Sequence, residues 1–377
     1  MATFPILHPA AIPPRKRADR AKETSLTLFP TAARHGNCES ASEAHSPAPA
    51  PDRSLKPAAE LVGIARLAAS SPCADARRGT EYFLLPVRSI LNYCNSERVP
   101  FRWTVNPYRG CEFGCRYCYA RYTHEFMELG GEEFEKKIYV KQDAGALSGR
   151  DLDNEKIWGE HIAIGTATDP YQPAEKTFGA TRAILEKIAE REGLSVSITT
   201  KSDQVVRDVD VLKRIAERSE ISVNITVTTL RTRLARLLEP RAPRPDLRLK
   251  ALKKLREARI AAGVNAMPVI PGLTDSEGDL DALVKAAREA GAQWIGASVL
   301  FLMPAALKQF LPFIREKFPK LHRQYGAWYG RHAYAPEAYR EAISERFRAL
   351  RKKYDIGGRP ERIGGQAWRS PQLSLNL

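Results

Sequence analysis

The stretch Asn106–Arg121, which reads NPYRGCEFGCRYCYAR, decides the fold of this 377-residue chain. It places Cys111, Cys115 and Cys118 within eight residues, while the other three cysteines are scattered along the chain. Cysteines this close together in a reducing compartment indicate a metal site. A glycine before each of the first two permits the tight loop that such a site needs. Three thiolates are one fewer than the four that hold an iron–sulfur cube in an electron-transfer protein, so one iron is left for another ligand, as catalysis requires.

The C-x3-C-x2-C spacing, with Tyr117 directly before the third cysteine, resembles the signature of the radical S-adenosylmethionine (SAM) superfamily. The resemblance implies that Cys111, Cys115 and Cys118 hold a [4Fe–4S] cluster whose open iron binds the amino and carboxylate groups of SAM. It also implies reductive cleavage of SAM to a 5′-deoxyadenosyl radical, which abstracts a hydrogen atom from a substrate. A flavodoxin- or ferredoxin-like partner would supply the electron, and Tyr117 would lie beside the adenine.

Short apolar runs alternate with longer amphipathic segments from Val105 to about Leu302. The runs predict strands at His161–Gly165, Ser195–Thr200, Ser222–Thr228, Val264–Val269 and Trp294–Leu300. Helices are predicted between them, at Phe178–Glu192, Val206–Ser219, Asp246–Ala262 and Ser276–Ala290. Such alternation is typical of right-handed βαβ units around a parallel sheet. A further strand near Val105 brings the total to about six, fewer than the eight of a closed barrel, so we expect an α/β fold with a partial, TIM-like (β/α)6 barrel.

Composition divides the chain into four parts. Residues 1–80 are rich in Ala, Pro, Ser and Arg and show no sustained period, which predicts a disordered N-terminal arm. Residues 81–302 form the predicted core domain, with order beginning near Glu81. A basic, helical C-terminal extension is expected over 303–358, and a flexible tail over 359–377.

Four segments are together similar to one branch of the superfamily, which contains spore photoproduct lyase and its DNA repair photolyase-like relatives. They are NPYRGCEFGCRYCYAR, GTATDPYQPAE, ITTKS and MPVIPGLTD, within residues 80–300. The resemblance implies that Lys201 contacts the SAM carboxylate, and a lysine ammonium suits that contact. It also implies that Thr226 or Thr228 directs a polar side chain at SAM. The alternatives are a solvated lysine at a strand end and threonines that serve only as β-branched strand residues.

Two tyrosines around the third cysteine, Tyr117 and Tyr119, match a pair that the lyase is thought to use in relaying a radical. Simple packing beneath the cluster is an equal alternative for Tyr119. The lyase also has a hydrogen-donating cysteine on the strand after the cluster. The corresponding stretch here, IAIGTATDPYQPAE, contains no cysteine. We therefore do not expect this chain to reverse spore photoproduct by that mechanism.

Four polar residues follow the predicted strand His161–Gly165 at the carboxyl rim, where barrel enzymes assemble their sites. They are Asp169, Tyr171, Gln172 and Glu175. We expect at least one of them to line the substrate cavity. Helix capping and loop structure are the alternative for all four.

The formal net charge of +15 at pH 7 favours a polyanionic partner such as nucleic acid. The segment 231–259 is especially basic, but it has no interleaved aromatic residues, and a solvated helix face is the alternative. The C-terminal QLSLNL resembles the short peptide by which bacterial DNA-processing proteins bind the replication sliding clamp, with Gln372, Leu375 and Leu377 as anchors.

Two other functions stay open from the sequence. A zinc site built from the three cysteines and His124 would make the chain a nucleic-acid-binding protein without catalysis. Alternatively, the radical chemistry would act on a protein or a small metabolite. The chain contains no apolar run of about 18 residues, and its first residues lack the order of a secretory signal. We therefore expect no membrane association and a cytoplasmic location.

Overall fold

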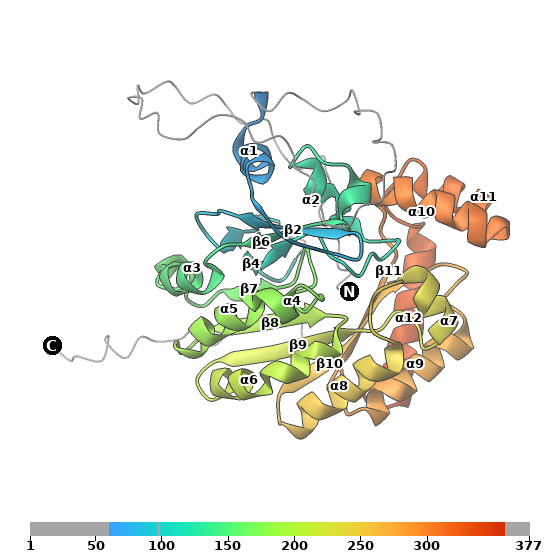
Figure 1. Ribbon diagram of the computed structural model, residues 1–377. Helices are drawn as coiled ribbons and strands as arrows, with labels where there is room; N and C mark the ends of the chain where they lie inside the picture. Colours follow the sequence, from blue (N-terminus) through green and yellow to red (C-terminus); the bar gives the residue numbers. More distant parts are fainter. Residues whose placement is uncertain (1–59, 97–98, 359–377) are drawn as a thin grey trace.

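Six parallel strands lie side by side in the larger sheet of the computed structural model, which describes residues 60–96 and 99–358 (Figure 1). In pairing order they are β4 (Trp103–Val105), β7 (His161–Ile164), β8 (Ser195–Thr200), β9 (Glu220–Thr226), β10 (Ala261–Val269) and β11 (Ile295–Val299). The short strand β3 (Leu91–Tyr93) pairs antiparallel with β4 at one edge. Because β3 and β11 end the pairing order of the described strands, the sheet is open, and the predicted α/β fold with six β/α units is confirmed.

Helices follow the strands and cover the outer side of this sheet (Figure 1). They are α4 (Glu175–Phe178), α5 (Ala180–Ala189), α6 (Val209–Ala216), α7 (Thr232–Leu238), α8 (Pro245–Glu257) and α9 (Glu277–Glu289). The strand side chains beneath them are fully buried, as Val196, Ile198, Val223 and Ile225 illustrate. Burial of each such side chain stabilises the fold by roughly 1.5–3 kcal/mol, which explains the near-continuous apolar runs in the sequence.

The predicted boundaries hold best where a local signal ends the element. Ser276 caps α9, its hydroxyl accepting a hydrogen bond from the Asp279 amide. The helix predicted to reach Ala262 instead ends at Glu257, and Arg259 has a left-handed backbone with φ of 64°. Alanine favours helices, but Ala261 and Ala262 pair with β9 in the sheet, and this pairing overrides their propensity.

A second, smaller sheet was not expected. It pairs β1 (Cys73–Arg77), β2 (Thr80–Leu85), β6 (Lys137–Lys141) and β5 (Tyr108–Arg109), in that order. Figure 1 shows it above the barrel strands, with α1 (Gly63–Ala69), α2 (Tyr122–Glu125) and α3 (Ala144–Asp151) around it. Among the described residues, α1 and β1 lie upstream of Glu81, near which we predicted that order begins. β1 is exposed or only half-buried, so it has no apolar run in the sequence, and it forms a strand by pairing with β2. Residues 1–59 lie outside the described part.

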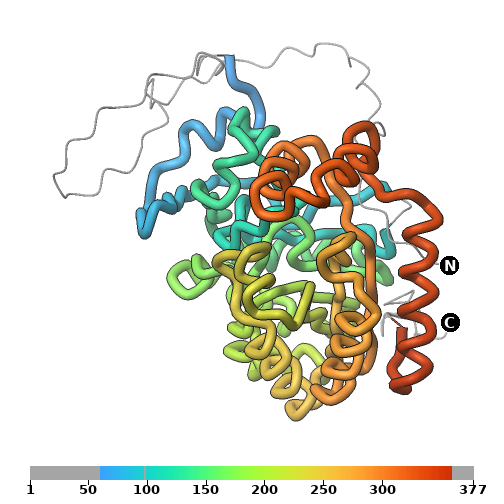
Figure 2. Tube along the Cα trace, turned by 90° about the vertical axis from the view of Figure 1, so that its right-hand side faces the viewer, coloured from blue at the N-terminus to red at the C-terminus, as the bar shows by residue number. Residues whose placement is uncertain are grey.

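Three helices follow the last barrel strand in the described part of the chain: α10 (Pro304–Lys317), α11 (Pro319–Tyr329) and α12 (Glu337–Lys353). α12 packs against β11 and α9, where it covers the end of the sheet (Figure 2). Within residues 60–96 and 99–358, no helix is long and apolar enough to cross a membrane. The C-terminal peptide with Gln372, Leu375 and Leu377 lies outside the described residues.

Candidate metal centre and its surroundings

The cysteine loop connects β5 to the short 3-10 helix η3 (Tyr119–Arg121), just beyond the carboxyl end of β4. Gly110 opens the loop with φ of +84°, and the Cys111 amide donates a hydrogen bond to the Phe134 carbonyl. A Cβ at position 110 would lie 2.7 Å from the Lys137 carbonyl oxygen and 2.8 Å from that of Phe134. Only glycine therefore fits where the loop begins.

Cys111, Cys115 and Cys118 are free, and the first two are buried. Burial is the main cause that raises the pKa of all three thiols, to about 12 for Cys115. After burial, the charge of Asp169 and then those of the other two cysteines also raise the pKa of Cys111. Three thiols in one loop are the donor set of an iron–sulfur or zinc centre, in which the bound metal displaces their protons.

The three sulfurs are not arranged around a single ion. In the described ranges, no group of three or more His, Cys, Asp or Glu side chains is placed to hold one metal ion. His124, the fourth ligand of the zinc alternative, directs Nε2 at the Lys137 carbonyl oxygen at 2.9 Å and packs against the Phe134 and Tyr139 rings. A single zinc ion needs four ligands within about 2.3 Å, whereas a four-iron cube is larger and separates its thiolates. The type of centre that the three cysteines hold stays a prediction.

Lys201 stands beside the cysteine loop, directly after β8. Its Nζ lies 5.8 Å from the centre of the Tyr117 ring. Asp169 holds its backbone, because one carboxylate oxygen accepts from the Lys201 amide at 2.7 Å and the other from the Thr200 hydroxyl at 2.6 Å. Burial lowers the pKa of Lys201, but the negative charges of Cys115 and Glu239 outweigh it and raise the pKa above its usual value. Lys201 is therefore a fixed positive charge next to the predicted cluster.

Tyr117 lies between two of the cysteines in sequence and is buried. Its hydroxyl donates to Glu239 and lies 3.0 Å from the Thr228 hydroxyl. Thr226 and Thr228 are also buried, at the end of β9 and in the loop that follows. The structure thus brings Tyr117, Lys201 and Thr228 together around the cysteine loop, and their contact with SAM stays a prediction.

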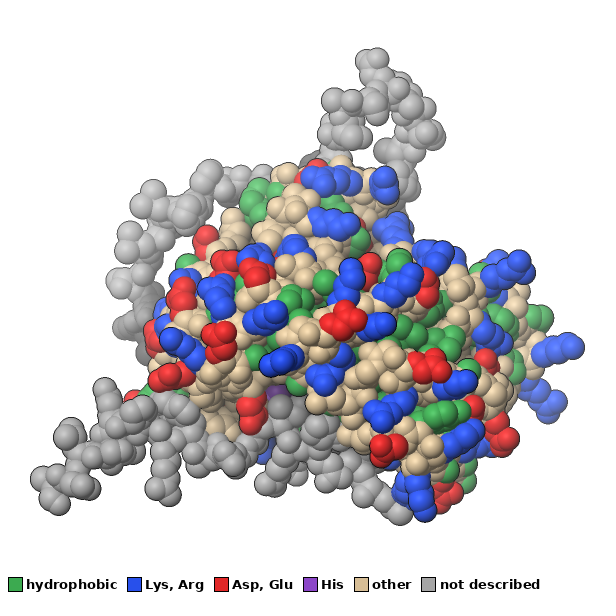
Figure 3. All heavy atoms as spheres, turned by 90° about the horizontal axis from the view of Figure 1, so that it is seen from below, with side chains coloured by type: hydrophobic (Ala, Val, Ile, Leu, Met, Phe, Trp, Pro, Cys, Tyr) green, Lys and Arg blue, Asp and Glu red, His purple; other side chains and the backbone are tan. Residues whose placement is uncertain are grey.

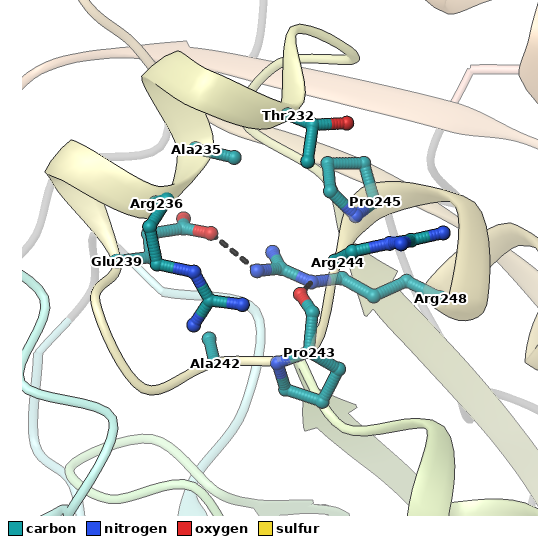
Figure 4. Close-up of a pocket in the computed structure, with 9 residues that line it drawn as sticks. All are labelled: Thr232, Ala235, Arg236, Glu239, Ala242, Pro243, Arg244, Pro245 and Arg248. Carbon is teal, nitrogen blue, oxygen red and sulfur yellow. Dashed lines mark hydrogen bonds and ion pairs between the residues drawn. The ribbon is translucent and has the colours of Figure 1, made fainter.

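We did not predict the buried ion pair between Glu239 and Arg248 from the sequence (Figure 4). Their charged groups are 2.5 Å apart, and both side chains are only 1% exposed. Arg248 belongs to the basic segment 231–259, for which phosphate contact and a solvated face were the alternatives, and neither applies to this residue. The helical pattern did indicate that Arg248 is buried, because it lies on the apolar face of α8 with Ala251, Leu252 and Leu255.

Gln172 and Glu175, two of the four predicted substrate residues, are completely buried and hydrogen-bonded within the protein. The Gln172 amide accepts from the Glu112 backbone at 2.9 Å and donates to the Gly110 carbonyl at 3.2 Å, which braces the cysteine loop. Glu175 accepts from the Tyr108 hydroxyl at 2.5 Å, pairs with Arg207 and accepts from two backbone amides at the start of α5. These contacts favour the loop-structure alternative for both residues.

Asp169 and Tyr171, the other two, are buried as well. Asp169 holds the backbone of Lys201 as described above, and the charge of its carboxylate raises the pKa of Cys111. Tyr171 lies beneath the Arg207 guanidinium, 6.0 Å from the ring centre. Substrate contact by any of the four stays a prediction.

Tyr119 donates a hydrogen bond from its hydroxyl to the Thr166 carbonyl. Burial raises its pKa, and nearby Tyr122 and Cys118 contribute. The hydroxyl therefore links the cysteine loop to the end of β7, which is compatible with both a radical relay and simple packing.

Comparisons with known proteins agree with this arrangement. A sequence model of the radical SAM superfamily matches residues 105–284. An uncharacterized protein of Mycobacterium tuberculosis is 33% identical over 309 residues, which are 81% of this chain and 89% of that protein. An uncharacterized protein of Methanocaldococcus jannaschii is 35% identical over 184 residues, 48% of this chain and 66% of that protein.

Among solved structures, a mutant of spore photoproduct lyase superposes with a TM-score of 0.56 at 16% identity, over 74% of this chain and 80% of the lyase. Another mutant, with bound AdoMet and dinucleoside spore photoproduct, gives a TM-score of 0.55 at 14% identity, over 80% of this chain and 87% of the lyase. At these identities the likeness is one of fold.

Proposed function

Because the chain belongs to the radical SAM superfamily, and is therefore an enzyme that uses SAM and an iron–sulfur cluster, we propose that Cys111, Cys115 and Cys118 hold a [4Fe–4S] cluster. The observation that carries the proposal is the grouping of three free thiols of one loop against Lys201 and Tyr117. The chemistry that the bound cluster and SAM supply is reductive cleavage of SAM and hydrogen abstraction from a substrate.

The residues around the loop would bind and orient SAM. Lys201, whose backbone amide Asp169 holds, would pair its ammonium with the SAM carboxylate as a point charge. The Tyr117 ring forms a wall beside the adenine, and Thr228 or Thr226 offers a hydroxyl to SAM. Tyr119 relays a radical or supports the loop from below.

Nucleic acid is the substrate class that we favour. The net charge of +15 attracts a phosphate backbone, and the fold is that of a lyase whose solved structure holds a dinucleoside photoproduct. The absence of a cysteine from residues 162–175 argues for a reaction other than reversal of spore photoproduct. Clamp binding by Gln372, Leu375 and Leu377 would bring the enzyme to DNA, and a flavodoxin- or ferredoxin-like protein would reduce it.

The test is anaerobic reconstitution with iron and sulfide, reduction with dithionite, addition of SAM and assay of 5′-deoxyadenosine. We expect about four irons per chain and 5′-deoxyadenosine formation. Cys115→Ala should abolish both, and Cys94→Ala is the matched control because this free thiol lies outside the loop. One zinc per chain with no 5′-deoxyadenosine would contradict the proposal.

A further inference from the structure

The Glu239 carboxylate accepts hydrogen bonds from three side chains, one of which is Tyr117. Both the Tyr117 hydroxyl and the Thr228 hydroxyl donate to Glu239 Oε1, the latter at 2.7 Å. Arg248 Nη2 donates to the second carboxylate oxygen at 2.5 Å. Figure 4 shows the Glu239 and Arg248 side chains directed at each other from the two sides of the α7–α8 connection. Glu239 thus joins the cysteine loop, the end of β9 and α8.

Arg248 cannot turn away from this carboxylate. Its Nη1 donates to the Thr226 carbonyl at 3.1 Å and its Nε to the Pro243 carbonyl at 2.8 Å. A planar guanidinium held at three points has one orientation. The Glu239 carboxylate is in turn fixed, and it presents a negative charge to the phenol of Tyr117.

The cavity beside the Glu239 carboxylate is too small for a group larger than water to take the place of the Tyr117 hydroxyl. The cavity beside the ion pair, lined by Thr232, Ala235, Glu239 and Arg248 among others, measures about 10 Å³ (Figure 4). That space accommodates about one water molecule. A hydrogen bond to a buried carboxylate is charge-assisted and roughly twice as strong as a neutral one, so the Tyr117 ring has a single preferred orientation.

We infer that Glu239, held by Arg248, is a positioning residue that fixes the Tyr117 ring as a wall of the SAM site. The same orientation sets the face of the ring that lies 5.8 Å from the Lys201 ammonium. The inference rests on the proposed function, because it concerns the SAM site of that proposal. It assigns a role in the site to two residues of α7–α8 that lie outside the cysteine motif.

The experiment measures SAM affinity by equilibrium dialysis with the anaerobically reconstituted full-length protein, together with iron content and the EPR spectrum of the reduced cluster with and without SAM. The variants are Glu239→Gln, Tyr117→Phe and the double variant. The matched control is Asp208→Asn, which also converts a fully buried, arginine-paired carboxylate into an amide, but on η6 (Asp203–Asp208), paired with Arg182 and Arg207.

We expect Glu239→Gln and Tyr117→Phe each to weaken SAM binding about tenfold, with wild-type iron content, and Asp208→Asn to bind SAM as the wild type does. Tyr117→Phe removes the hydrogen bond, and Glu239→Gln removes the charge that strengthens it. Because both variants act on the same contact, the double variant should be weakened no more than Tyr117→Phe alone, about tenfold. A hundredfold loss in the double variant would show that Glu239 acts independently of Tyr117 and would overturn the inference.

Wild-type affinity in Glu239→Gln would also overturn the inference, and it would leave the proposed function intact. If Glu239→Gln loses its cluster, Tyr117→Phe decides alone, because it leaves the ion pair in place, and wild-type affinity there refutes the inference. A wild-type protein that binds no SAM contradicts the proposed function and the inference with it.

Discussion

At the scale of single residues, the site depends on how buried charges are balanced. Lys201, Arg248, Glu239 and Asp169 lie close together, and each influences the pKa of another. Buried charges are tolerated only when they are paired. Within this group, Arg248 and Glu239 form a closed pair, whereas the Lys201 ammonium makes no hydrogen bond or ion pair with another described residue and has the free donors that a carboxylate of SAM would need.

Replacing Lys201 with methionine should leave the cluster in place and weaken SAM binding at least tenfold. The substitution keeps an unbranched side chain, one atom shorter, and removes the charge that would face the SAM carboxylate. A charge-assisted hydrogen bond is worth about 1.5–3 kcal/mol. Iron analysis and equilibrium dialysis measure the two quantities. Lys213→Met on the exposed face of α6 is the control, and equal affinities in the two variants would exclude the role of Lys201.

At the scale of elements, the cysteine loop is shaped by its neighbours in the small sheet. Gly110 lies against the backbone carbonyls of Phe134 and Lys137, and Gln172 holds the loop from the other side. These contacts come from two segments, one at Phe134–Lys137 and one at Gln172. The loop is therefore preorganised by its surroundings before any cluster binds.

The close approach at Gly110 predicts a stability difference between two glycine variants. Gly110→Ala and Gly79→Ala both place an alanine at positive φ, +84° and +75° respectively. That strain alone costs about 1–2 kcal/mol, and a Cβ at Gly79 would meet open space. Overlap with two carbonyl oxygens should destabilise Gly110→Ala by roughly 1–3 kcal/mol more. Denaturant unfolding of the two variants tests this, and equal losses would show that the loop can move aside.

Glu239, at the connection between α7 and α8, should make a contribution to the free energy of unfolding that is lost in acid. Burial raises the pKa of Glu239, but the charges of Arg248 and Lys201 outweigh it and lower the pKa to about 2, from an ordinary value of 4.5. The folded state therefore binds a proton less readily than the unfolded state. The stabilisation is full above pH 4.5 and is lost as the pH falls from there toward 2.

Unfolding midpoints of the apoprotein between pH 6 and pH 3 measure this contribution. The wild type should lose stability as the pH falls through this range, and Glu239→Gln should lose less, because it has no carboxylate to protonate. The difference between the two proteins is the informative quantity, since other carboxylates titrate in both. Parallel curves for the two proteins would contradict the lowered pKa.

At the scale of the whole molecule, the net charge of the chain bears on its partner, and on the face seen from below the positive charge is spread rather than gathered (Figure 3). Figure 3 shows basic side chains distributed over one face with acidic side chains among them. On α8, Lys250, Lys253 and Lys254 are exposed. A dispersed basic surface suits contacts to phosphates that do not depend on nucleotide sequence.

We expect DNA binding that weakens steeply with salt, because each phosphate contact releases condensed counterions. Changing Lys250, Lys253 and Lys254 to glutamine should reduce the slope of log affinity against log salt by up to about 3 if all three contact phosphates. Lys213→Gln with Arg214→Gln on α6 is the control. Fluorescence anisotropy with a labelled oligonucleotide measures both. No binding at low salt would favour a protein or small-molecule substrate.

The sequence by itself determined the features that arise from local patterns. Six apolar runs predicted six parallel strands, because burial on both faces of a sheet demands such runs. The cysteine spacing placed three thiols in one loop, on which the proposed cluster site rests. The tertiary structure decided what depends on distant partners. The Tyr117 hydroxyl donates to the carboxylate of Glu239, 122 positions later, and β2 pairs with β6 across the cysteine loop. Gln172 and Glu175 form their hydrogen bonds within the protein itself. The physical reason is that a buried polar side chain is defined by the group that satisfies it, and the chain brings that group near only when it folds.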